Sequence, residues 1–210
     1  MDYRNEPLIR YLDDAAAAKP TPGGGSVAAV AAALASTMAS MAAGFTAGKE
    51  KYKAVEPEIQ EALRQLADLR QRLLDAAHQD MAAYETVMAA YRMPKNTDAE
   101  KAARAQAATK ATRASLDVVE RVCKGAKEVL EVARRLAEIA NPNLASDVGV
   151  AAELALGAIR AAQINVLVNL AGYGDAADAA AVRRRTDEAV AEAERLARET
   201  RAIVTRQLSK

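Results

Sequence analysis

A carboxylate and a phenol fall on the apolar stripe of one segment with helical periodicity. Asp80 follows Leu73 by seven residues and precedes Tyr84 by four, so the three side chains share one helical face. A carboxylate that faces a protein core needs a partner, or its pKa shifts away from the ordinary value. The pattern leaves two interpretations open: a structural ion pair or hydrogen bond, or a group that transfers protons.

Two amide side chains lie in a second apolar segment. Asn165 and Asn169 are four residues apart on a largely apolar stretch from residue 161 to residue 171. Buried amides require hydrogen-bonding partners. Because an amide both donates and accepts hydrogen bonds, such a pair can hold the edge of a planar heterocycle.

Three consecutive glycines, Gly23, Gly24 and Gly25, precede Ser26 at the start of another predicted helix. Glycines permit positive φ angles and a close approach of a ligand to the backbone. The free N–H groups at a helix N-terminus favour an anion or a polar carbonyl edge. No Lys-Ser/Thr pair follows and no strand precedes, which argues against a P-loop and a dinucleotide fingerprint. A tight turn with Ser26 as N-cap is the simpler interpretation.

Three further candidates lie far from this turn. A helix from residue 26 to residue 45 is about 30 Å long, so Lys49 and Tyr52 are distant from the glycines of the same chain. Asp147 and Asn165 share a helical face but stand about 27 Å apart. Either the site is extended, or a second subunit completes it. Otherwise Lys49 and Tyr52 belong to a solvated loop, and Asp147 only complements a helix dipole.

Six helices are predicted to position these residues, and the fold class is all-α. Alanine, the best helix former, accounts for 53 of the 210 residues. Asn5 and Ser26 are expected to cap the first two helices, and Thr97 with Glu100 forms a capping box for the fourth. The predicted helices cover residues 6–18, 26–45, 57–91, 97–139 (loosened at Gly125), 146–170 and 176–207, within one domain over residues 1–210.

The second predicted helix lies in a segment without charged side chains, from Pro20 to Gly48. Such a length raises the possibility of a membrane span. Its apolar residues are mostly alanine, however, and a helix of small residues on all sides is better explained as one buried by other helices. We therefore predict a central, Ala-rich, buried helix that also contacts a partner subunit, and no membrane.

Charge and cysteine content exclude several classes of protein. The formal net charge of +1 argues against general binding of nucleic acid or anionic membranes. A single cysteine, Cys123, excludes an internal disulfide framework, and with one histidine it argues against a His/Cys zinc site in one chain. The first residues show no signal-peptide pattern. We expect a cytoplasmic protein.

The motifs together resemble the cyclodeaminase/cyclohydrolase family of folate enzymes. The matching stretches are PTPGGGSVAAVAAAL, MASMAAGFTAGKEKY, DMAAYETVMAAYRMPKNTDAEKAAR and NPNLASDVGVAAELALGAIRAAQINVLVNL. The resemblance in order and spacing covers nearly the whole chain, from about residue 5 to residue 175. The resemblance implies an all-helical homodimer with folate sites near the subunit interface. The stretch from Ala90 to Thr97 is more similar to stand-alone methenyltetrahydrofolate cyclohydrolases than to the cyclodeaminase half of formiminotransferase-cyclodeaminase.

The resemblance implies hydrolysis of 5,10-methenyltetrahydrofolate to 10-formyltetrahydrofolate, without a metal or redox cofactor. Water adds to the cationic bridge carbon, which requires a base, an acid and complementary negative charge. We assign Asp147 first and Asp80 second as the carboxylate, and Lys49 as an acid/base or orienting group. The expected substrate-binding residues are Gly23, Gly24, Gly25 and Ser26 for a polar edge or the glutamate tail, Tyr52 and Tyr84 for hydroxyl contacts or stacking, Lys95, and Asn165 with Asn169 for the pterin edge.

Two alternatives remain open from the sequence. Formimidoyltetrahydrofolate cyclodeaminases close the same ring but expel ammonia, so similar side chains could serve that reaction. A protein of another class, a non-catalytic helical interaction protein, would keep the fold without binding folate.

Overall fold

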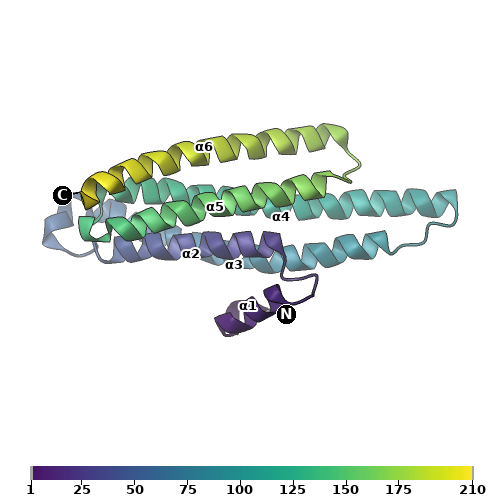
Figure 1. Ribbon diagram of the computed structural model, residues 1–210, viewed down its shortest axis with the longest axis horizontal. Coiled ribbons are helices and arrows are strands. Elements are labelled where there is room, and N and C mark those ends of the chain that lie inside the picture. Colours follow the sequence, from purple (N-terminus) through teal and green to yellow (C-terminus); the bar gives the residue numbers. More distant parts are fainter. Residues whose placement is uncertain (1, 210) are drawn as a thin grey trace.

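The computed structural model describes residues 2–209, which form helices and connecting loops without strands (Figure 1). The α-helices are α1 (Leu8–Ala16), α2 (Gly24–Gly44), α3 (Glu56–Tyr91), α4 (Asp98–Ile139), α5 (Ala145–Leu170) and α6 (Ala176–Leu208). Three short 3₁₀ helices, Tyr3–Asn5, Glu50–Val55 and Pro142–Leu144, occupy segments that were expected to be irregular. The predicted all-α class and the six helices are confirmed.

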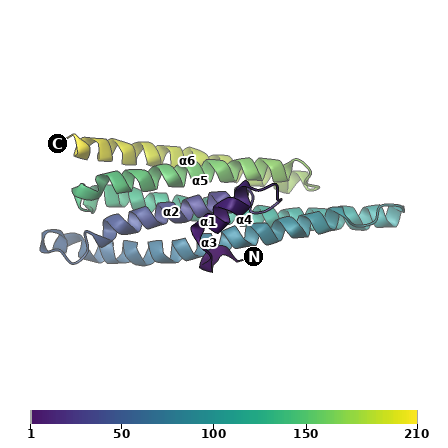
Figure 2. The same ribbon diagram turned by 60° about the horizontal axis from the view of Figure 1, so that its bottom comes forward.

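Helices α2 to α6 run side by side along the long axis of the molecule, and α1 lies outside this bundle (Figures 1 and 2). Helix α2 packs against α3, α4 and α5, whereas α6 covers α4 and α5. The α3–α4 hairpin projects beyond the turn between α5 and α6. This arrangement brings the first turn of α2 beside α3 and the C-terminal half of α5.

Alanine allows the helices of the core to approach closely. The α2 residues that are at most 1% exposed include Ala28, Ala29, Ala32, Ala35, Ala39, Ala42 and Ala43. Leucines and isoleucines of the neighbouring helices, such as Leu66 and Leu116, fill the space against them. Helix α4 continues through Gly125, where loosening was expected. A Cβ at Gly125 would lie 3.0 Å from Leu73 Cδ2, so the glycine permits close packing of α3 and α4.

Helix α2 is central but is not buried on all sides, which corrects the sequence prediction. Val27, Leu34 and Met41, spaced by seven residues, are 46%, 50% and 43% exposed. By length and composition alone, α2 and the segment Pro142–Leu170 could each cross a membrane. Both helices pack against the rest of the bundle, and half of the apolar window of α2 is buried, as in the core helix of a helical bundle.

The helix caps were predicted with mixed success. The capping box of Thr97 and Glu100 is present at the start of α4. Asn5 is wrong as the cap of α1, because Pro7 takes the N-cap position there without a side-chain hydrogen bond. Ser26 is also wrong as a cap: α2 begins earlier, after Gly23, and the Ser26 hydroxyl contacts Tyr11 instead.

Candidate active site

A cavity of about 400 Å³ lies at the first turn of α2, between α3, α4 and α5. Its volume is within the range of small-molecule sites. The lining residues are Pro20, Thr21, Gly23, Gly24, Gly25, Asp80, Tyr84, Val87, Met88, Tyr91, Thr112, Ser115, Asn165, Val168, Asn169 and Gly172. The cavity thus gathers the glycine turn, Asp80 and Tyr84 of α3, and both asparagines of α5. Asp80 and Tyr84 face inward, as their positions on the apolar stripe of α3 predicted.

Asp80 carries the only formal charge among these lining residues. Its Oδ2 accepts a hydrogen bond of 2.8 Å from the backbone N–H of Ser26, in the first turn of α2. It forms no ion pair within residues 2–209. Burial raises the pKa of Asp80, and the hydrogen bond from Ser26 opposes this shift only in part. The cavity therefore presents a carboxyl group with a raised pKa and no paired cation, which marks it as a candidate functional group.

Gly24 and Gly25 lack a Cβ and so let neighbouring side chains approach the backbone of the turn closely. Neither glycine has an unusual backbone conformation. A Cβ at Gly25 would lie 2.1 Å from Asp80 Oδ1, and one at Gly24 would lie 3.0 Å from the amide of Asn165. Among residues 2–209, the only glycine with a positive φ is Gly48. The glycine turn therefore does not use the positive φ that glycine permits, and the expected close approach of a ligand to its backbone stays a prediction. Within the chain, the atoms that approach the turn belong to side chains of α3 and α5.

Amide and hydroxyl groups of α4 and α5 form the polar wall of the cavity. Asn169 Nδ2 donates to Ser115 Oγ at 3.2 Å, and Asn165 Nδ2 donates to the carbonyl oxygen of Ala161 at 2.9 Å. Within residues 2–209, neither amide oxygen accepts a hydrogen bond from the protein, and Thr112, only 5% exposed, adds a second hydroxyl. This wall can donate and accept hydrogen bonds along the edge of a planar ring.

The sequence prediction missed Thr112 and Ser115. Both lie in α4, where alanine and polar residues alternate with no strong apolar stripe at its N-terminal end. Nothing in that pattern distinguishes these two hydroxyls from the exposed polar residues around them. Only the packing of α4 against α5 turns them toward the cavity.

Four predicted site residues lie elsewhere in the chain. Lys49 and Tyr52 follow the C-terminal end of α2, the opposite end from the glycine turn. A hydrogen bond of 2.9 Å from the N–H of Asn141 to Thr46 Oγ1 joins this end to the segment that precedes Asp147. Lys95 is exposed in the loop between α3 and α4. One chain therefore does not bring these four residues into the cavity.

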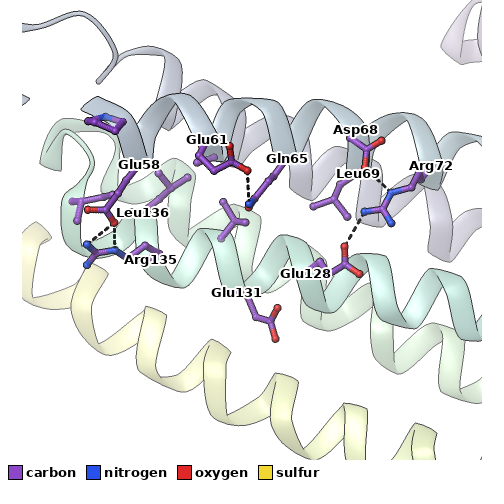
Figure 3. Close-up of a pocket in the computed structure, with 14 residues that line it drawn as sticks. Glu58, Glu61, Gln65, Asp68, Leu69, Arg72, Glu128, Glu131, Arg135 and Leu136 are labelled. Atoms are coloured by element: carbon purple, nitrogen blue, oxygen red, sulfur yellow. Dashed lines mark hydrogen bonds and ion pairs between the residues drawn. The ribbon is translucent and has the colours of Figure 1, made fainter. Parts of the chain in front are cut away.

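A larger groove of about 730 Å³ lies between α3 and α4 (Figure 3). Its lining is rich in charge, but the acidic side chains are paired with cations. Glu58 lies 2.6 Å from Arg135, and Arg72 lies 2.8 Å from both Asp68 and Glu128. These pairs tie α3 to α4 along the surface and leave little free charge for a ligand.

Asp80 and the neighbouring hydroxyl groups equip the cavity for acid–base chemistry. No group of three or more His, Cys, Asp or Glu side chains suited to a metal ion occurs in residues 2–209. Cys123 is buried within α4 and does not line the cavity, and burial raises the pKa of its thiol to about 12. Asp80 and the surrounding hydroxyl and amide groups are the available reactive and binding groups.

The sequence is similar to proteins whose activity is known. The family model described as formiminotransferase-cyclodeaminase matches residues 7–188. A methenyltetrahydrofolate cyclohydrolase of Methylorubrum extorquens is 39% identical over 90% of this chain and 91% of its own length. A formimidoyltransferase-cyclodeaminase of Sus scrofa is 28% identical over 90% of this chain, which corresponds to 35% of that longer enzyme.

A solved structure has the same fold. The crystal structure of a formiminotetrahydrofolate cyclodeaminase from Thermotoga maritima superposes with a TM-score of 0.81 and 32% sequence identity. The match covers 98% of this chain and 96% of that chain.

Proposed function

The chain belongs to the formiminotransferase-cyclodeaminase family, and from this membership and the site we infer that it hydrolyses 5,10-methenyltetrahydrofolate to 10-formyltetrahydrofolate. The similarity to the methenyltetrahydrofolate cyclohydrolase extends over nearly the full length of both proteins. The observation in the structure that carries this function is Asp80, a carboxyl group without an ion pair in a cavity whose other lining groups are neutral. The substrate is a cation at its one-carbon bridge, so the two are complementary in charge.

The reaction requires a proton acceptor and a proton donor in sequence. We propose that Asp80 accepts a proton from water as the water oxygen bonds to the bridge carbon. The resulting neutral adduct carries a hydroxyl group and two ring nitrogens on one carbon. The carboxyl group then returns its proton to the departing nitrogen, and the hydroxyl proton leaves to solvent as the formyl C=O forms. The balance is one water consumed and one proton released, with no metal or redox cofactor in any step.

The remaining cavity residues bind the substrate in this proposal. Asn165 and Asn169 hold the pterin edge, and Tyr84 contacts or stacks on the ring. The N–H groups of Gly24 and Gly25 bind a polar edge of the folate, whereas the N–H of Ser26 donates to Asp80. These assignments are supported by the positions of the residues around one cavity of suitable volume.

We further propose that the enzyme is a homodimer with α2 at its interface. The support is the exposed apolar stripe of α2 together with exposed Val150 and Ile164 of the neighbouring α5. Leu34 lies at the middle of the 21-residue α2. A two-fold axis near Leu34 would align the helices antiparallel and place the Lys49 end of one subunit beside the glycine turn of its partner. Lys49, Tyr52 and Asp147 would then complete the partner's site.

Mixing two inactive variants tests this shared site. We expect Asp80→Asn and Lys49→Met each to reduce turnover by at least ~100-fold. If the two residues of one site come from different subunits, a dimer of one Asp80→Asn and one Lys49→Met chain keeps one intact site. Unfolding and refolding the mixture should then restore about a quarter of the wild-type activity. No recovery, with heterodimers demonstrated by mass spectrometry, would contradict the shared site. Asp147→Asn replaces Lys49→Met in a second mixture.

The dimer itself is tested at Leu34. Leu34→Asp would place two like charges near the two-fold axis, so we expect monomers in sedimentation velocity and loss of turnover. Leu208→Asp, at a leucine that is also exposed at the end of α6 (62% against 50% for Leu34), is the matched control and should remain dimeric. A fully active Leu34→Asp monomer would show that one chain suffices.

The cyclodeaminase reaction is the second candidate, because the solved cyclodeaminase of Thermotoga maritima shares the fold over nearly the whole chain. Spectrophotometric assays with methenyltetrahydrofolate and with formimidoyltetrahydrofolate separate the two activities. We expect turnover of the methenyl substrate. Ammonia release from the formimidoyl substrate without hydrolysis of the methenyl substrate would favour the alternative. An absence of folate binding in calorimetry would favour a non-catalytic interaction protein.

A further inference from the structure

A line of hydrogen bonds connects α1 with the carboxylate of Asp80. The hydroxyl of Tyr11 lies 3.0 Å from Ser26 Oγ, and the N–H of Ser26 donates to Asp80 Oδ2 at 2.8 Å. Tyr11 is 7% exposed and Ser26 is fully buried. Ser26 therefore contacts α1 through its side chain and the carboxylate through its backbone.

Ser26 lies between two cavities. On the side of α1, a small cavity of about 170 Å³ is lined by Tyr11, Ser26 and residues of α3. On the other side, Gly25 and Asp80 line the cavity proposed to bind folate. Tyr11 therefore does not line the folate cavity, and it reaches Asp80 only through the turn that contains Ser26.

The Tyr11 ring is held in place by its own surroundings. Tyr3 packs edge-on against it, with ring centroids 5.2 Å apart and an interplanar angle of 86°. The Tyr3 hydroxyl donates to Asp14 Oδ2 at 2.9 Å, so that bond points away from Ser26. Tyr11 and Asp14 are the only buried residues of α1. Asp14 also forms two ion pairs and so stays paired without the Tyr3 hydroxyl, whereas the Tyr11 hydroxyl is the group of α1 that contacts Ser26.

We propose that Tyr11 is a positioning residue, whose hydroxyl fixes the Ser26 turn and thereby the direction of the Asp80 carboxylate toward the bridge of the substrate. This inference rests on the proposed role of Asp80 in the hydrolysis. Tyr11 does not contact the reacting atoms and transfers no proton.

Because Gly25 lies against the Asp80 carboxylate, a small movement of the turn would change the position of the carboxylate. The backbone of this turn approaches Asp80 so closely that a Cβ at Gly25 would overlap the carboxylate oxygen. Without the Tyr11 hydroxyl, the buried Ser26 Oγ loses its partner and turns toward a carbonyl of the preceding turn. The Ser26 N–H then shifts relative to Asp80. Burial and the charge of Asp80 raise the pKa of Tyr11, and the hydrogen bond with Ser26 opposes this shift in part.

The test compares two phenylalanine variants of the same N-terminal segment. Tyr11→Phe removes the hydroxyl that contacts Ser26, whereas Tyr3→Phe, the matched control, removes the hydroxyl that contacts Asp14. We expect Tyr11→Phe to reduce kcat for methenyltetrahydrofolate roughly ten-fold, with KM changed less than two-fold, because a misplaced catalytic group slows chemistry more than binding. Tyr3→Phe should keep wild-type kcat. Circular dichroism confirms that each variant is folded.

A double-mutant cycle distinguishes positioning from a general loss of structure. Ser26→Ala breaks the same hydrogen bond from its other side, and it gives an independent measurement should Tyr11→Phe fail to fold. If both act through one bond, Tyr11→Phe combined with Ser26→Ala should reduce kcat no further than the stronger single variant. Multiplicative losses, or a loss of the same size in Tyr3→Phe, would overturn the proposal.

The outcome for Asp80 separates this inference from the proposed function. If Asp80→Asn is inactive while Tyr11→Phe and Ser26→Ala retain wild-type kcat, the positioning role is wrong and the proposed function stands. If Asp80→Asn retains full turnover, the proposed role of Asp80 fails, and the positioning role fails with it.

Discussion

The groove between α3 and α4 and the cavity at the start of α2 differ in whether their carboxylates are paired with cations. In the larger groove between α3 and α4, each lining carboxylate has a basic partner within 3.4 Å: Glu58, Glu61, Asp68, Glu128 and Glu131. In the smaller cavity at the start of α2, Asp80 has only a backbone N–H as its partner. Judged by volume alone, the groove would be the candidate active site. The absence of a compensating cation at Asp80 selects the cavity, because that charge is available to a cationic substrate.

The paired carboxylates of the groove and the unpaired Asp80 are expected to affect the stability of the fold differently. Compensated surface pairs contribute little and can be removed with little effect. An uncompensated, largely desolvated carboxyl group favours its protonated form in the folded state and so destabilises the fold when it is ionised. Substitutions in the two regions should therefore separate activity from stability.

The largest effect is expected from crowding the cavity. Gly25→Ala would place a methyl group 2.1 Å from Asp80 Oδ1, so the carboxylate must move. We expect kcat/KM for methenyltetrahydrofolate to fall by at least ~100-fold, the scale of a displacement of about 1 Å in a catalytic group. Gly44→Ala, in the same helix with open space around its Cβ, is the control and should retain activity. Wild-type activity in Gly25→Ala would show that the carboxylate position is unimportant.

A smaller effect is expected at the polar wall. Asn165→Ala removes an amide whose oxygen is left for a ligand, so we expect KM to rise up to ~10-fold, as for the loss of one hydrogen bond. Gln163→Ala is the control on the same helix, because Gln163 binds exposed Asp187 and lies outside the cavity. Steady-state kinetics measure both. Equal KM values for the two variants would remove Asn165 from the binding site.

The pH dependence of stability gives a third comparison. Because burial raises the pKa of Asp80 in the folded state, folding is favoured at low pH by its protonation. This contribution is lost as pH rises from the ordinary carboxyl pKa through the raised one. Asp80→Asn lacks the effect, so its free energy of unfolding should improve relative to the wild type as pH rises. Urea unfolding from pH 4 to pH 7 measures the difference. If the free energy of unfolding of the wild type instead rose relative to that of Asp80→Asn with increasing pH, the raised pKa of Asp80 would be contradicted.

The smallest effect is expected in the groove. Glu58→Gln breaks the pair with Arg135, and both side chains are about half exposed. We expect a loss of at most ~1 kcal/mol in the free energy of unfolding and no change in kcat/KM. Thermal unfolding and the folate assay check this. A ten-fold loss of turnover in Glu58→Gln would return the groove to consideration as the active site.

Most of the fold could be predicted from the sequence, because it depends on local patterns. Apolar spacing and breakers such as Pro94 place the ends of the long helices within about two residues of those observed. The errors occur where tertiary contacts override local chemistry. Ser26 has the residue type of a cap, but Tyr11, fifteen residues earlier, binds its hydroxyl. Helix α2 is alanine-rich throughout, and composition alone does not show which stripe the bundle leaves exposed.

The candidate site was predictable to the extent that polar residues interrupt apolar stripes. Asp80, Tyr84, Asn165 and Asn169 stand out in this way, and all four line the cavity. Thr112, Ser115 and Tyr11 give no such signal, since their neighbours are polar or lie outside the bundle. Lys49, Tyr52, Lys95 and Asp147 follow from the family resemblance, and within one chain they lie away from the cavity. Their roles remain predictions, and the subunit-mixing experiment tests those of Lys49 and Asp147.

The most direct test of the account is the turnover of Asp80→Asn with 5,10-methenyltetrahydrofolate. The amide is close in size to the carboxylate and can still accept the hydrogen bond from Ser26, so the fold and the cavity should persist. The account predicts a fall in kcat of at least ~100-fold, with an unchanged circular dichroism spectrum and retained binding of a folate analogue. A folded Asp80→Asn variant with kcat within two-fold of the wild type would contradict it.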